Sequence, residues 1–187
     1  MLTRRTFFYG CMAAIAAPQA AFAKTPKPPF VLNPEYMPQI VDYPTYEEIG
    51  TVVIDPRNRF LYLIDDEYSA IRYGIGVGRA GRAFSGTAEV GRKAKWPRWQ
   101  PTDNMIKRQP EKYARYADGV AGGGSNPLGA RALYLYRNGR DTYYRIHGTT
   151  EPWSIGKAVS NGCIRMINEH VMDLYERVPL GTPVIVL

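Results

Sequence analysis

Short apolar runs separated by turn residues fill the chain after Gly50, a pattern typical of a mainly β domain. Runs rich in Val, Ile, Leu and Tyr predict strands at residues 51–54, 59–64 and 70–77. The turn Asp55-Pro56-Arg57-Asn58 and the acidic segment 65–67 are short polar connections. We therefore expect an antiparallel meander here.

The same pattern returns near the C-terminus, where residues 132–136 and 142–146 predict two strands around the turn 137–140. A helix is predicted next, because apolar residues recur at helical spacing at Val171, Leu174, Tyr175 and Val178. Asn168 is a suitable N-cap for it, and Pro179 with Gly181 ends it. Residues 184–187 predict a last strand, so the domain should finish with a helix and a strand.

Residues 78–129 are less regular, because glycines and prolines interrupt every apolar run. A connection of this length inside a compact domain is usually functional. We expect a long irregular insert that faces the substrate, with a short helix around 105–117 interrupted near Pro110.

The first residues predict export. Residues 1–23 combine Arg4 and Arg5, an apolar stretch and the small residues Ala21 and Ala23, as a cleavable signal peptide does. The paired arginines before two phenylalanines are typical of a twin-arginine signal, and an uncleaved amphiphilic anchor is the alternative. After cleavage we expect no stable membrane span and an envelope or periplasmic location.

Residues 24–48 contain six prolines, too many for a helix or a central strand. We expect a Pro-rich linker that acts as a spacer, with an arm packed on the domain as the alternative. The folded domain would then comprise residues 49–187.

The formal charge of +7 falls to +5 once Arg4 and Arg5 are removed. The basic residues are scattered, and the densest group, between Arg79 and Arg98, is interleaved with glycine, proline and tryptophan rather than forming a nucleic-acid motif. We expect no nucleic-acid partner. An anionic polymer outside the cytoplasm fits the export signal, and a solvated basic loop is the alternative.

Removal of residues 1–23 takes away Cys11 and leaves Cys163 as the sole cysteine, so an intrachain disulfide is excluded. A single thiol in an oxidising compartment indicates a nucleophile, with an inert buried cysteine as the alternative. Because Gly162 precedes it, backbone amides around Cys163 are candidates to bind an oxyanion.

A thiol with a pKa near 8.5 needs a partner that accepts its proton. His147 ends a predicted strand sixteen residues before Cys163, whereas His170 lies in the first turn of the predicted helix, a position typical of surface residues. We favour His147 as the base, since sites assemble where strands end at loops.

Residues 146–149, Ile-His-Gly-Thr, and 160–166, Ser-Asn-Gly-Cys-Ile-Arg-Met, together resemble the signature of the L,D-transpeptidase catalytic domain. In that family a His-Gly pair precedes a Ser-x-Gly-Cys-x-Arg segment by about a dozen residues. The segments 126–129, 151–156 and 181–184 are also similar to the family, so the resemblance covers about residues 49–187.

The resemblance implies a mainly β fold, a mixed sandwich with the cysteine and histidine facing one another in a cleft. It implies that Cys163 is the nucleophile, that His147 is its base, and that the Gly148 carbonyl orients the imidazole. The residues implied to bind the oxyanion or the substrate are Gly162, Asn161, Ser160 and Arg165, and the two backbone amides of Gly162 and Cys163 are the implied oxyanion donors. Among these, Arg165 would support the loop or pair with a substrate carboxylate, and Ser160 would fix the turn.

The family reaction is acyl transfer on peptidoglycan stem tetrapeptides through a thioester, without a metal or organic cofactor. The acceptor is the amine of a second stem, which gives a 3→3 crosslink, the lysine of an envelope protein, or water. Trp96, Trp99 and Trp153 are candidates to line the cleft, with packing at the core or rim as the alternative.

Three other functions remain open at this point. The same dyad would serve a carboxypeptidase or amide hydrolase, which the sequence does not separate from a transpeptidase. A non-catalytic wall-binding module would have no chemical need for Cys163, His147 and Gly148 together. A sortase-like or papain-like protease needs an acidic or arginine partner that no motif places.

Overall fold

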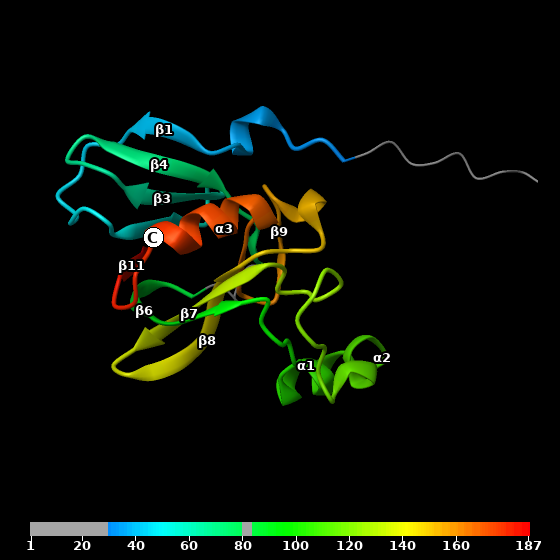
Figure 1. Ribbon diagram of the computed structural model, residues 1–187. Helices are drawn as coiled ribbons and strands as arrows, with labels where there is room; N and C mark the ends of the chain where they lie inside the picture. The colour runs from blue at the N-terminus through cyan, green and yellow to red at the C-terminus, as the bar shows by residue number, and fades with distance from the viewer. Residues whose placement is uncertain (1–29, 80–83) are drawn as a thin grey trace, which may run out of the picture.

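The computed structural model describes residues 30–79 and 84–187, which form a curved mixed sheet with a small second sheet and several helices (Figure 1). The nine strands of the main sheet follow the order β1-β4-β3-β2-β11-β6-β7-β8-β10. Their bounds are β1 Gln39–Asp42, β2 Val52–Asp55, β3 Phe60–Ile64, β4 Ser69–Gly74, β6 Gly86–Lys95, β7 Arg131–Arg137, β8 Arg140–His147, β10 Ile164–Arg165 and β11 Pro183–Val186. The second sheet pairs β5 Val77–Gly78 with β9 Ala158–Ser160.

The predicted meander is confirmed, because β2 pairs antiparallel with β3 and β3 pairs antiparallel with β4. The first turn is stabilised by the Asp55 carboxylate, which accepts hydrogen bonds from the Arg57 and Asn58 amides at 2.9 and 3.0 Å. The predicted hairpin of β7 and β8 is also confirmed. Its turn residues Asn138 and Gly139 have φ of 51° and 72°, as a tight two-residue turn requires.

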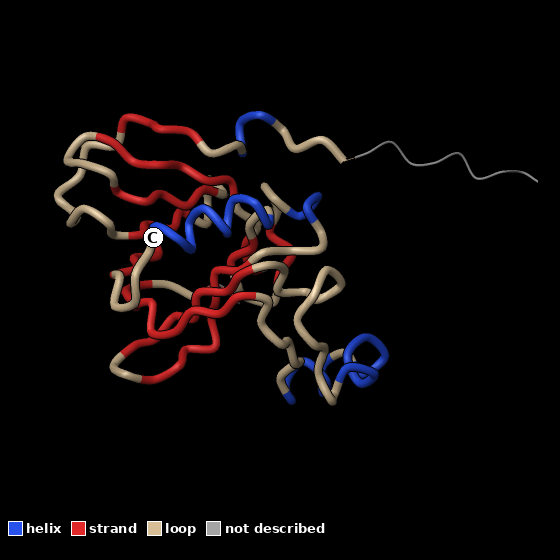
Figure 2. Tube along the Cα trace, viewed as in Figure 1, coloured by secondary structure: helices blue, strands red, loops and turns tan. Residues whose placement is uncertain are grey.

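The C-terminal helix α3 Asn168–Arg177 and strand β11 complete the core. Strand β11 lies between β2 and β6, parallel to the first and antiparallel to the second. In Figures 1 and 2 the β1-β4-β3 half of the sheet and the β6-β7-β8 half lie on opposite sides of α3. The buried face of α3, with Val171 and Leu174, belongs to one hydrophobic cluster with residues of both halves. The mainly β fold is therefore confirmed, and the two layers belong to one continuous sheet.

The prediction that residues 78–129 are irregular was wrong for their first part. Strand β6 spans ten residues and pairs with both β11 and β7. Gly91 interrupts its sequence pattern because the Tyr136 ring lies against the strand there, and a Cβ on Gly91 would be 2.4 Å from Tyr136 Cγ. The pairing is also shifted at this point, as in a β-bulge.

The second part of the insert is irregular, as expected, and carries the helices α1 Asp103–Arg108 and α2 Pro110–Tyr113 and the 3-10 turn η2 Ala114–Tyr116. The predicted interruption near Pro110 is confirmed, since Pro110 is the first residue of α2. An isolated β-bridge between Trp99 and Val120 joins the two ends of this part of the insert, residues 99–120, which we call the irregular lobe.

The segment expected to be a linker is attached to the domain over its described part. A 3-10 turn η1 Pro34–Tyr36 is followed by β1, which pairs antiparallel with β4 at the edge of the sheet. Prolines exclude a central strand but are tolerated at an edge, and here Pro38 directly precedes β1. The folded part thus begins before residue 49, in agreement with the alternative of a packed arm.

The predicted signal peptide, residues 1–23, and the start of the linker lie outside the described residues. Of the helices in residues 30–79 and 84–187, none is long and apolar enough to cross a membrane.

Candidate active site

Strands β8 and β10 bring the two halves of the sequence motif together. They pair in parallel, with Ile164 opposite Ile146 and Arg165 opposite His147. On its other side, the Arg165 backbone exchanges two hydrogen bonds with Gly76, at 2.8 and 2.9 Å. Cys163 directly precedes β10, so this pairing fixes the segment that carries Cys163 beside the strand that ends at His147.

Gly78 allows its strand to approach the loop that carries Cys163 closely. A Cβ on Gly78 would lie 2.8 Å from Gly162 Cα, so any larger residue would displace the loop that carries Cys163.

The His147 ring is buried, with 5% of the residue exposed, and it is held in one tautomer. Its Nδ1 lies 2.5 Å from the Gly148 carbonyl oxygen. Because a carbonyl only accepts hydrogen bonds, Nδ1 carries the proton and Nε2 keeps a free lone pair. Burial, opposed by this bond and aided by the charges of Arg165 and Arg145, lowers the His147 pKa to about 4. The imidazole is therefore neutral at neutral pH.

The Asn168 side chain lies against the backbone of Gly129 and Gly148. Its side-chain oxygen accepts a hydrogen bond from the Ala130 amide at 3.0 Å. A Cβ on either Gly129 or Gly148 would lie 2.2 Å from that oxygen. The helix N-cap is Ile167 rather than Asn168, so the predicted capping role was wrong: the Asn168 side chain turns away from its own helix to contact this loop.

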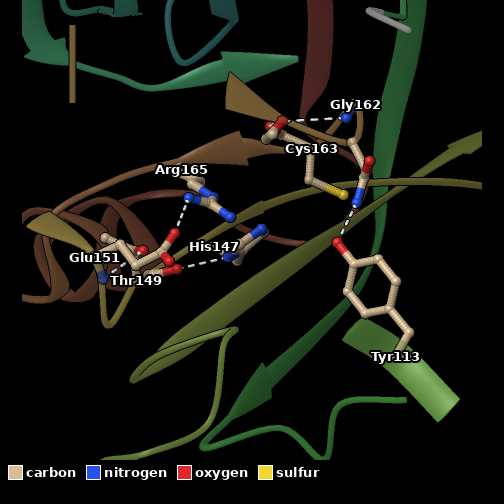
Figure 3. A network of polar contacts seen from close by, with 10 residues as sticks. Tyr113, His147, Thr149, Glu151, Gly162, Cys163 and Arg165 are labelled. Carbon is tan, nitrogen blue, oxygen red and sulfur yellow. Dashed lines mark hydrogen bonds and ion pairs between the residues drawn. The ribbon is translucent and has the colours of Figure 1, made fainter. Parts of the chain in front are cut away.

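Cys163 is half-buried, and its sulfur donates a hydrogen bond to the Tyr143 carbonyl on β8 at 3.8 Å. Within the described residues no hydrogen bond joins this sulfur to the His147 ring. In Figure 3 the Cys163 side chain lies above the His147 ring, and no dashed line joins the two. Burial raises the Cys163 pKa, and the positive charges of Arg145 and Arg165 oppose that shift. Thiol and imidazole are therefore both neutral at rest.

The Ser160 hydroxyl closes the turn that carries Cys163. It donates to the Cys163 carbonyl at 2.6 Å and accepts from the Gly162 amide at 3.1 Å. The Gly162 N–H is thus directed at Ser160, which leaves the Cys163 N–H as the candidate oxyanion donor of the two expected amides.

The other two expected residues, Arg165 and Asn161, each have a side-chain partner that the sequence did not predict (Figure 3). Arg165 forms an ion pair with Glu151 at 2.5 Å, so in this structure it supports the 151–156 loop. Asn161 donates to the Tyr113 hydroxyl at 2.9 Å, which connects the loop that carries Cys163 to α2. Glu151 lies in a segment similar to the family, but no sequence pattern relates Tyr113 or Asn168 to Cys163.

The alternative base, His170, lies in the core rather than at the surface, and the expectation of a surface position was wrong. Only 6% of the residue is exposed, and its ring packs 6.5 Å from that of Tyr73. The apolar spacing placed His170 outside the buried face of this helix, but the face extends one position further, because the His170 ring packs against Tyr73 of β4.

Two hollows meet at Cys163, with volumes of about 730 and 360 Å³. The larger is bordered by α1 and by Asn161 and Gly162, and the smaller by Trp99 and three arginines. Trp96 and Trp153 are about half exposed and border neither hollow. The irregular lobe therefore faces the cysteine, and the sulfur is reachable from two sides. In the part of the chain that the structure describes, no three His, Cys, Asp or Glu side chains gather as a metal site requires.

The model of the L,D-transpeptidase catalytic domain matches residues 49–186. The chain belongs to the L,D-transpeptidase family. Among its relatives, the probable L,D-transpeptidase YbiS of Escherichia coli is 35% identical over 161 residues, which cover 85% of this chain and 50% of YbiS. The probable L,D-transpeptidase ErfK/SrfK of Escherichia coli is 34% identical over 79% of this chain and 47% of its own length. The chain thus spans about half the length of these curated relatives.

Solved structures share the fold of this L,D-transpeptidase domain. A Brucella melitensis protein described as a probable carnitine operon oxidoreductase is 54% identical, with a TM-score of 0.58 over 83% of this chain and 96% of that one. L,D-transpeptidase 3 of Mycobacterium tuberculosis has a TM-score of 0.54 at 17% identity, over 74% of this chain and 61% of that one, which indicates a shared fold.

Proposed function

We propose that this chain is an exported cysteine L,D-transpeptidase that forms a thioester with peptidoglycan stem tetrapeptides and transfers the acyl group to an amine. The observation that carries the proposal is the fixed tautomer of His147: the Gly148 carbonyl at 2.5 Å keeps the proton on Nδ1, which leaves Nε2 free to accept another. Family membership over residues 49–186 supports the substrate class.

The first half of the reaction begins with a neutral thiol. His147 Nε2 takes the thiol proton as Cys163 Sγ attacks the carbonyl carbon of the third stem residue, and the Cys163 amide stabilises the resulting oxyanion. The C–N bond then breaks, the imidazolium returns its proton to the departing amine, and D-alanine leaves a thioester on Cys163. Since Sγ donates its hydrogen bond to the Tyr143 carbonyl in this structure, the S–H must turn toward the imidazole before attack.

In the second half an acceptor amine attacks the thioester carbon. Its proton passes to His147, the C–S bond breaks, and the thiolate recovers the proton. The amine of a second stem gives a 3→3 crosslink, and the lysine of an envelope protein gives an anchored protein. Water in place of an amine gives a carboxypeptidase. Residues 1–23 support an envelope location for all three reactions.

The test is mass analysis of stem tetrapeptides after incubation with the purified mature chain. Wild type should release D-alanine and form a covalent adduct with a carbapenem, and Cys163→Ala should do neither. The product mass identifies the acceptor: a crosslinked dimer supports transpeptidation, whereas a trimmed tripeptide alone supports the hydrolase.

The base is tested by a matched pair of histidine variants. His147→Gln should slow acylation by about two orders of magnitude or more, while His170→Gln, which removes an equally buried ring outside the site, should leave the rate near that of wild type. D-alanine release by Cys163→Ala, or equal damage from the two histidine variants, would contradict this assignment. Intact binding without turnover by wild type would favour a wall-binding module.

A further inference from the structure

The two hollows that meet at Cys163 differ in charge. The larger one is bordered by Asp103 together with Lys107 and Arg108, so its charges are mixed. The smaller one, of about 360 Å³, is bordered by Arg92, Arg98 and Arg145. Among the described residues no aspartate or glutamate borders it. Arg145 is paired with Asp141, and the other two guanidinium groups have no ion pair within the described residues, so this side of the sulfur is cationic.

Sheet register explains why two of these arginines meet. Arg92 on β6 pairs with Tyr134 on β7, and Tyr134 pairs with Arg145 on β8. Directly paired residues point to the same face of a sheet, so both guanidinium groups flank the Tyr134 ring. Their central carbons lie 3.5 Å (Arg92) and 4.7 Å (Arg145) from the ring centroid. His147 follows Arg145 by two residues on β8 and therefore lies on this face as well.

The three arginines are not equally available to a ligand. Arg145 forms an ion pair with Asp141 at 3.1 Å, and Arg98 donates to the Asp118 carbonyl. Arg92 is exposed and has neither an ion pair nor a side-chain hydrogen bond within the described residues. The Tyr134 ring, with 4% of the residue exposed, supports its guanidinium from one side. The N–H donors of Arg92 are therefore free, and the Tyr134 ring holds the guanidinium at the hollow that Cys163 also borders.

We propose that this arginine pocket binds the terminal carboxylate of the acyl donor, that is, the carboxylate of the residue that leaves. The inference rests on the proposed function, which places the attacked carbonyl at Cys163. The leaving residue then spans about 3.5 Å of extended chain, so its carboxylate must lie close to the sulfur. Guanidinium groups bind carboxylates through paired hydrogen bonds, and Arg92 is the residue with that capacity unused.

The charge of the pocket also decides where the acceptor enters. The guanidinium groups of the smaller hollow repel an ammonium group. The larger hollow leads to the same sulfur, and there the Asp103 carboxylate offsets part of the positive charge of Lys107 and Arg108. The donor terminus therefore occupies the smaller hollow, and the amine approaches through the larger one. The pocket makes Arg92 a specificity-determining residue that favours donors with a free C-terminus.

The test is a binding measurement that does not depend on turnover. In the Cys163→Ala background, calorimetry compares a stem tetrapeptide that ends in a free carboxylate with the same peptide ending in a carboxamide. The acid should bind about tenfold more tightly, as expected for a charge-assisted pair. Arg92→Gln should reduce this ratio to about two or below, and Arg92→Lys should keep an intermediate ratio.

Arg115→Gln is the matched control, since Arg115 is also exposed and lies 4.7 Å over a tyrosine ring, Tyr116, but borders neither hollow. It should keep the full ratio. Equal affinity for acid and amide, no binding of either peptide, or the same loss of preference in Arg92→Gln and Arg115→Gln would overturn the proposal. If the protein clearly prefers the acid but never releases D-alanine, the proposed reaction is refuted, whereas carboxylate binding by this pocket is supported.

Discussion

The Asn168 side-chain oxygen accepts a hydrogen bond from the Ala130 amide at 3.0 Å, across 38 residues of sequence. That oxygen also contacts the backbone at Gly129 and Gly148, and the Gly148 carbonyl in turn holds the His147 ring. The start of α3 thereby positions the candidate base through one peptide group. Asn168 touches no reacting atom, so it is a positioning residue.

Asn168→Ala should lower both stability and activity. It leaves the Ala130 amide without its acceptor and opens a gap beside Gly148, which we expect to cost about 1–3 kcal/mol of unfolding free energy. The Gly148 peptide would also be less firmly held, so acylation should slow, with a lower kcat and an unchanged KM. Urea unfolding and D-alanine release measure the two effects. Asn168→Asp keeps an acceptor oxygen and should recover most of the loss, and its failure to do so would contradict this role.

Gly148→Ala should disrupt the site, because its Cβ would lie 2.2 Å from the Asn168 oxygen. Combining it with Asn168→Ala removes that atom, so the double variant should be less damaged than the sum of the two single variants predicts. Gly124→Ala is the control, since a Cβ there meets nothing within 4 Å. Thermal unfolding of wild type, the two single variants and the double variant measures the coupling, and strict additivity would show that the clash is not the cause.

Stability should fall in acid because of His147. Its pKa is about 4 in the folded chain, against about 6.5 for an unfolded histidine. The unfolded state therefore binds a proton first, and this contribution to stability is fully present above about pH 6.5 and is lost as the pH falls toward 4. The difference amounts to about 3 kcal/mol. Urea unfolding at pH 7 and pH 4.5 should show a smaller decrease for His147→Gln than for wild type, and equal decreases would contradict the shift.

Alkylation by iodoacetamide should report a protonated resting thiol. Since burial raises the Cys163 pKa, the rate should keep rising above pH 9 and show no plateau at neutral pH. The Arg145 charge opposes the shift, so Arg145→Gln should react more slowly than wild type at pH 8, and Arg115→Gln should match wild type. A neutral-pH plateau would indicate a preformed thiolate and imidazolium pair instead.

Local patterns predicted those parts of the fold that neighbouring residues determine. Alternating apolar runs with good turns located β2, β3, β4, β7 and β8, because the alternation and the turn residues of a hairpin are signals local to its own segment. Strand β6 was missed because Gly91 makes room for Tyr136 of a different strand, and the edge strand β1 because prolines obscured it.

The sequence by itself determined the family and the residues on which the proposed chemistry rests: one cysteine in the predicted mature chain, a histidine followed by glycine, and the spacing between them. A motif records the residue types that a reaction requires. Only the tertiary structure decided which atoms meet. The tautomer of His147, the Asn168 contact, the occupied Gly162 amide and the arginine pair around Tyr134 all depend on strands and loops distant in sequence. Sheet register and backbone packing set these contacts, and neither leaves a periodic signal in the chain.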